Sequence, residues 1–122
     1  MSALGSLPFK IIDQGHLAEL IEAIGIEDFF DIVKTLEHEV NQQIVALEER
    51  SRACQAEDVK KAAHRLAGLL SQFGAFEVAA YAEKVQLAPS NDELNRLAAS
   101  MVDLCRASMA AIADLPLDPA SP

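Results

Sequence analysis

The sequence predicts an all-α fold, an up-down antiparallel four-helix bundle with a short N-terminal capping helix. Composition is the first observation: 51% of the residues are hydrophobic, Gly and Pro number five each, and Trp is absent, which is typical of helices rather than sheets. The second is that apolar residues recur at helical spacing in successive blocks separated by brief glycine, serine or proline breaks. Four long amphipathic blocks joined by short links pack most simply as antiparallel neighbours with their apolar stripes inward.

The length of 122 residues fits one domain with a core of its own. We expect an N-terminal extension over residues 1–12, the bundle over 13–114 and a flexible C-terminal tail over 115–122. Three prolines in the last seven residues argue against a continuing helix in that tail. The chain has enough apolar residues to close a bundle by itself, so we expect a monomer.

The first two helices are marked by a cap and a glycine. Asp13 is a good N-cap for a short helix that Gly25 ends. A longer helix follows from about residue 27 to about residue 52. Its predicted apolar stripe consists of Phe29, Val33, Leu36, Val40, Ile44 and Leu47.

Three further helices complete the bundle. One covers residues 56–73 and ends at Gly74, and the next covers 75 to about 87, ahead of Pro89. Ser90 and Glu93 have the spacing of a capping box, in which each residue satisfies a free amide at the start of the fifth helix. The inner faces of the last two helices are predicted to contain Val78, Tyr81, Ala82 and Val85, then Leu94, Leu97, Ala98, Met101, Cys105 and Ile112.

Charge and motifs exclude several classes of function. A net charge of −9 repels nucleic acid and anionic membranes, and no apolar run approaches the roughly 20 residues that span a bilayer. The start of the chain lacks the features of a signal peptide, so we expect a cytoplasmic location. Cys54 and Cys105 have no metal-ligand spacing, and both are interpreted as packing residues.

No enzyme signature is complete. His38 and Glu39 begin like a zinc-protease HExxH motif, but Gln42 stands where the second histidine is required. His16 has no partner at the spacing of a di-iron site. Without a P-loop, a Gly-rich nucleotide fingerprint or a GxSxG element, we expect no kinase activity, no hydrolase activity and no cofactor of its own.

His64 is distinguished by its place on the third helix. On a wheel of about 100° per residue, the apolar residues cluster on the side opposite His64, which removes the common interpretation of a lone histidine as a core residue. The predicted core face consists of Val59, Ala62, Leu66, Leu69, Leu70 and Phe73. The predicted open face around His64 consists of Glu57, Lys60, Lys61, Ala67, Gly68 and Ser71, with Gln72 a little further round.

Two features of this open face favour chemistry over an ordinary surface histidine. Gly68, one turn after His64, costs about 1 kcal/mol of helix stability relative to alanine, and a flat position beside an imidazole lets a second protein approach the ring. Lys60 and Lys61 could offset negative charge on the ring, although ordinary solvated lysines are an equally good interpretation. An exposed imidazole has a free ring nitrogen at neutral pH and needs no dedicated base to act as a nucleophile.

The residues around His64 resemble the signature of the histidine phosphotransfer (HPt) domain family. The segment AHRLAG at residues 63–68 is followed by LLSQF at 69–73 and then by a glycine. His64, Leu66, Gly68 and Gly74 agree with the family pattern in identity and spacing, and the resemblance extends over about residues 13–113. It implies that His64 accepts a phosphoryl group from the aspartate of one receiver domain and passes it to another in a two-component phosphorelay.

The resemblance also implies the partners. These are the receiver domain of a hybrid histidine kinase, a response regulator, or both, and the receiver supplies Mg²⁺. One departure is Ala67, which stands where the family has a lysine. Lys60, Lys61 or Arg65 then replaces that lysine, or transfer is less efficient or selective for one partner. The alternative function is a noncatalytic helical adaptor that binds receivers without efficient transfer, and a purely structural bundle is a third interpretation.

Overall fold

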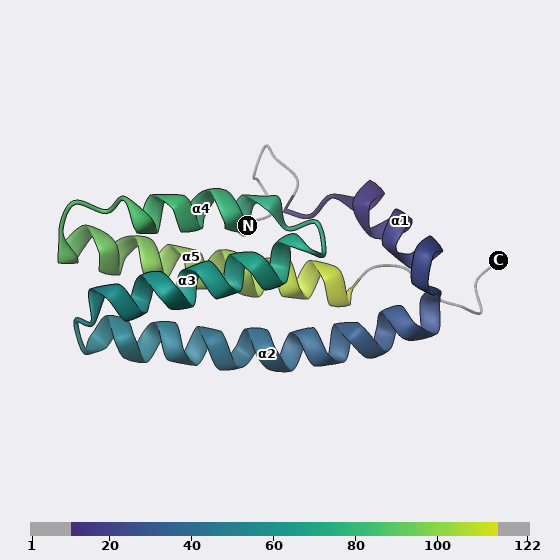
Figure 1. Cartoon of the computed structure of the whole chain (residues 1–122), viewed down its shortest axis with the longest axis horizontal. Helices are drawn as coiled ribbons and strands as arrows, with labels where there is room; N and C mark the ends of the chain where they lie inside the picture. The colour runs from purple at the N-terminus through teal and green to yellow at the C-terminus, as the bar shows by residue number, and fades with distance from the viewer. Residues whose placement is uncertain (1–10, 115–122) are drawn as a thin grey trace, which may run out of the picture.

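The computed structural model describes residues 11–114, and over that range the protein is all-helical. Figure 1 shows α2 to α5 side by side, with α1 at one end of them. The prediction of an all-α fold is confirmed, while the predicted tail and the first ten residues of the predicted extension lie outside the described range. The helices are α1 (Gln14–Ile24), α2 (Ile26–Arg52), α3 (Ala56–Ser71), α4 (Phe76–Gln86) and α5 (Asn91–Ala113).

The predicted boundaries of α1 are confirmed. The carboxylate of Asp13 accepts a hydrogen bond from the His16 amide at 3.0 Å, as an N-cap does. Gly25 adopts a φ of 89°, a conformation that glycine accepts without steric strain. Its amide donates to the Ile21 carbonyl at 2.7 Å, so Gly25 ends α1 immediately before α2 begins.

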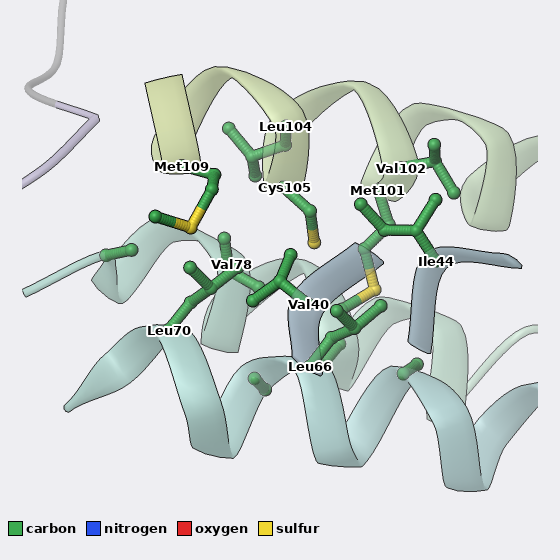
Figure 2. Packing of buried hydrophobic residues seen from close by; sticks show 14 of the residues in the cluster. Val40, Ile44, Leu66, Leu70, Val78, Met101, Val102, Leu104, Cys105 and Met109 are labelled. Carbon is green, nitrogen blue, oxygen red and sulfur yellow. The ribbon is translucent and has the colours of Figure 1, made fainter. Parts of the chain in front are cut away.

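The core draws on all five helices. All six residues of the predicted α2 stripe are buried, and in α4 Val78, Ala82 and Val85 are buried while Tyr81 is only partly so. Ile12, just before α1, is also buried. Figure 2 shows Leu66 and Leu70 of α3 pointing toward the side chains of Met101 and Cys105 of α5.

Cys105 is a packing residue, as predicted. Its side chain is fully buried, and this burial raises the pKa of the thiol to about 12 against the opposing effect of Arg106. The thiol is therefore held in its neutral form within the core.

Half of the predicted capping box forms at the start of α5. The hydroxyl of Ser90 accepts a hydrogen bond from the Glu93 amide at 3.2 Å. The carboxylate of Glu93 is engaged by the guanidinium of Arg96, one turn along the same helix. The reciprocal contact to Ser90 is thus replaced by an ion pair on the helix surface.

The prediction that Cys54 is a packing residue is wrong. Cys54 is exposed and lies in the turn between α2 and α3 with a φ of 57°. Its amide donates to the Ser51 carbonyl at 3.1 Å, and the Gln55 amide donates to the Arg50 carbonyl at 3.0 Å. These are the two bonds of a Schellman turn, in which this position is left-handed and usually glycine, so the side chain points out of the bundle.

The turn after α3 has the same bonding pattern with a glycine. Gly74, at a φ of 83°, donates to the Ser71 carbonyl at 3.1 Å, and Ala75 donates to the Leu70 carbonyl at 3.1 Å. The Gly74 carbonyl accepts from the Asp13 amide at 2.9 Å. A Cβ atom on Gly74 would lie 2.9 Å from the Asp13 carbonyl oxygen. Both the conformation and the close approach of the α1 cap therefore require glycine here.

Candidate functional site

α3 packs against three other helices, α2, α4 and α5. On a wheel of about 100° per residue its buried positions cover roughly 140°. His64 lies outside this arc and is exposed to solvent. The buried residues are Val59, Ala62, Ala63, Leu66, Ala67 and Leu70.

His64 borders a shallow hollow of about 310 Å³ between α3 and α4, which we call the histidine hollow. It is lined by Glu57, Lys60, Lys61, His64, Arg65 and Gln86. The side-chain amide of Gln86 donates to the Lys60 backbone carbonyl at 2.9 Å and joins the end of α4 to α3 at this place. Within the hollow, Lys60 Nζ lies 3.9 Å from Glu57 Oε1. Half of the lining residues thus carry positive charge beside an accessible imidazole.

Gly68 faces open space. An added Cβ would meet no atom within 4 Å, so this glycine serves no close packing of helices. It borders a second hollow of about 440 Å³ between α2 and α3, which we call the glycine hollow. Its lining consists of Glu39, Gln42, Gln43, Arg65, Gly68, Leu69 and Gln72. Arg65 borders both hollows and lies between them.

The charge on α3 differs in sign from that of the other helices. Three cations, Lys60, Lys61 and Arg65, outnumber Glu57 and Asp58. Each of the other four helices within residues 11–114 carries a net negative charge, in keeping with −9 for the chain. Among the helices within residues 11–114, α3 is thus the one whose charge favours an approaching anion.

The residues predicted around His64 do not all reach the surface. Lys61, Arg65, Gly68 and Gln72 are exposed, and Lys60 and Ser71 are partly buried.

Ala67 was expected on the open face and is buried, with 8% of its surface exposed. It lies on the same side of α3 as Lys60, whose carbonyl binds Gln86 of α4. That side is covered because α3 packs against α4 as well as against α2 and α5.

The chain matches no protein-family model, no curated protein and no solved structure. Within residues 11–114 no group of three or more His, Cys, Asp and Glu side chains is placed to hold a metal ion. Nor does any helix in that range combine the length and apolarity needed to cross a bilayer.

The other two histidines have different surroundings. His38 is exposed on α2, as predicted for an ordinary surface residue. His16 Nε2 lies 2.9 Å from the Gln72 carbonyl oxygen and can donate to it, and the ring meets the edge of Phe76 at a centroid distance of 5.5 Å. His16 thus links α1 to the end of α3.

Residues contributed by neighbouring helices were missed by the sequence interpretation. Gln86 of α4 completes the histidine hollow, and Glu39, Gln42 and Gln43 of α2 form one wall of the glycine hollow. A helical wheel places the residues of one helix only. It does not include the side chains that a neighbouring helix contributes to a site. The outward direction of Gln42 on its own helix was the one available signal.

Proposed function

We propose that this protein is a histidine phosphotransfer protein: His64 accepts a phosphoryl group from the phosphorylated aspartate of one receiver domain and passes it to another in a two-component phosphorelay. The observation that carries the proposal is an exposed imidazole beside a helical glycine that faces open space. The signature around His64, Leu66, Gly68 and Gly74 supports the same function. The scaffold we propose for it is an up-down antiparallel four-helix bundle of α2 to α5, capped by α1.

The transfer is an in-line displacement at phosphorus. A neutral ring nitrogen of His64 attacks, the N–P bond forms while the P–O bond to the aspartyl group breaks, and the aspartate leaves as a carboxylate. The return step reverses these bonds on a second receiver. Such a reaction depends on positioning and on stabilising charge, and the exposed ring and the cations of α3 serve these two needs.

The contribution of the partner is the one that the resemblance to the HPt family implies. The receiver, part of a hybrid kinase or a response regulator, contributes the aspartate and the Mg²⁺ that neutralises charge on the phosphoryl group. This chain contributes a nucleophile and a docking face, as a cytoplasmic monomer without kinase activity of its own. The absence of a helical side chain at Gly68 leaves room for the receiver to reach the ring.

The test is phosphoryl transfer from labelled receiver domains to the full chain. Wild type should acquire an acid-labile label, His64→Gln should acquire none, and the matched control His38→Gln should behave as wild type. A panel of the receivers of the same genome identifies the donor and the acceptor. Labelling of His64→Gln at the wild-type level would show that the site is assigned wrongly.

A second candidate is a noncatalytic adaptor that binds receivers without efficient transfer. Ala67 favours it, because this buried alanine occupies the position of the family lysine. The adaptor predicts that His64→Ala binds a receiver and supports its output as well as wild type does. A phosphorelay protein would lose its output with the same substitution while retaining binding.

A further inference from the structure

We infer that the histidine hollow holds the phosphoryl group once it is on His64, and that Lys61 supports it there in place of the lysine missing at Ala67. This inference rests on the proposed function and adds the phosphoryl subsite and its positioning residue. It concerns the N-terminal side of His64, whereas the family lysine would stand on the C-terminal side.

The direction of helical side chains places the ring over this hollow. Side chains in an α-helix lean toward the N-terminus and cover the turn before their own Cα. His64 accordingly borders the hollow that contains Lys60 and Lys61, and it does not border the glycine hollow. A group attached to the ring therefore lies among the cations of the preceding turn.

The two hollows then have separate tasks. The histidine hollow, with about 310 Å³ of space and three cations on its rim, has the charge to hold a phosphoryl dianion. The glycine hollow, with about 440 Å³ and three glutamines among its seven lining residues, leaves room for the partner's polypeptide. Arg65 borders both and can face either the phosphoryl group or the partner.

Lys61 is the better support of the two lysines. Lys60 is already paired with Glu57 at 3.9 Å, and its side chain is only 26% exposed. Lys61 is exposed, lies three residues before His64 on its side of the helix, and has no ion pair within residues 11–114. Its ammonium group is free to turn toward the phosphoryl group at no loss of an existing contact.

The experiment separates the phosphoryl subsite from receiver docking by using a small donor. Phosphoramidate transfers its phosphoryl group to the imidazole and releases ammonia, so no partner is required. The full chain is compared with Lys61→Gln, with Lys61→Arg, and with Lys34→Gln, a matched control on the exposed side of α2. Two quantities are measured: the rate of hydrolysis of the phosphorylated ring, and the pH at which the phosphoryl group takes up a proton, followed by ³¹P NMR.

Lys61→Gln should change the phosphoryl ionisation constant roughly two- to fivefold, as expected for one exposed ion pair. The pH at which the phosphoryl group takes up a proton becomes higher, because the dianion loses a nearby cation. The rate at which the phosphorylated ring is hydrolysed changes as well. Lys61→Arg should restore the wild-type midpoint and Lys34→Gln should leave it unchanged. A merely structural role of Lys61 would not move this midpoint.

Two failures are distinguishable. If wild type is labelled on His64 and Lys61→Gln has the same midpoint and hydrolysis rate, the inference is overturned and the proposed function stands. If wild type takes no label from phosphoramidate or from any receiver, the proposed function fails and the inference fails with it.

Discussion

Gly68→Ala should stabilise the protein. Gly68 lies within α3, three residues before the helix ends at Ser71, and the new methyl group would meet no atom within 4 Å. The gain comes only from the reduced freedom of the unfolded chain and amounts to about 0.5–1 kcal/mol. For a domain of this size that raises the melting temperature by a few degrees. Urea and thermal unfolding followed by far-UV circular dichroism measure it.

Gly74→Ala is the matched control, because the same chemical change there should destabilise. Residue 74 has a φ of 83°, and a Cβ there would lie 2.9 Å from the Asp13 carbonyl oxygen. Alanine at this position should therefore lower the free energy of unfolding by about 1–3 kcal/mol. If Gly68→Ala is destabilising, the glycine has a structural task and its interpretation as a docking feature is refuted. Gly68→Gln extends the series: the fold should remain while transfer from a receiver slows, and an unchanged transfer rate would contradict the docking argument.

Three further predictions concern the turn after α2 and the core. Cys54→Gly should raise the free energy of unfolding by about 1 kcal/mol in urea titrations, because glycine relieves the left-handed backbone at a φ of 57°; a loss would show that the side chain has a stabilising contact. Leu66→Ala should lower it by about 2–5 kcal/mol, since this leucine is fully buried, and a loss below 1 kcal/mol would mean that the core readily collapses around the gap. Cys105 should react with thiol reagents far more slowly than Cys54. Because its pKa is raised from 9.0 to about 12, its stabilising contribution is complete below pH 9 and is lost as the pH rises toward 12; the stability difference between wild type and Cys105→Ala should shrink over that window, and a constant difference would contradict the assignment.

The spacing of apolar residues predicted the buried positions best in α2, because one face of α2 packs against other helices and the opposite face is exposed to solvent. Its stripe from Phe29 to Leu47 is buried residue for residue. α3 was harder, since packing against α4 as well as against α2 and α5 widens its buried arc to include Ala63 and Ala67. Alanine is compatible with both buried and exposed surroundings, so its burial depends on how the neighbouring helices pack. The sequence of one helix alone does not predict it.

Turn chemistry explains the other differences. The turn after α3 could be predicted because Gly74 occupies its left-handed position. Cys54 occupies the same position in the turn after α2, where no glycine indicates a turn. At the site, His64 and Gly68 were identified from their own helix. Gln86 was not, because it reaches the Lys60 carbonyl from α4 across a distance of 26 residues in sequence.

The contacts at the two ends of α3 determine how a partner would meet this surface. At one end Gln86 joins α4 to the Lys60 carbonyl, and at the other His16 and Asp13 join the start of α1 to Gln72 and Gly74. The stretch with His64 and Gly68 lies between these two attachments. If a receiver docks here as proposed, the backbone of this face is already held in place, so its association should resemble the docking of rigid bodies.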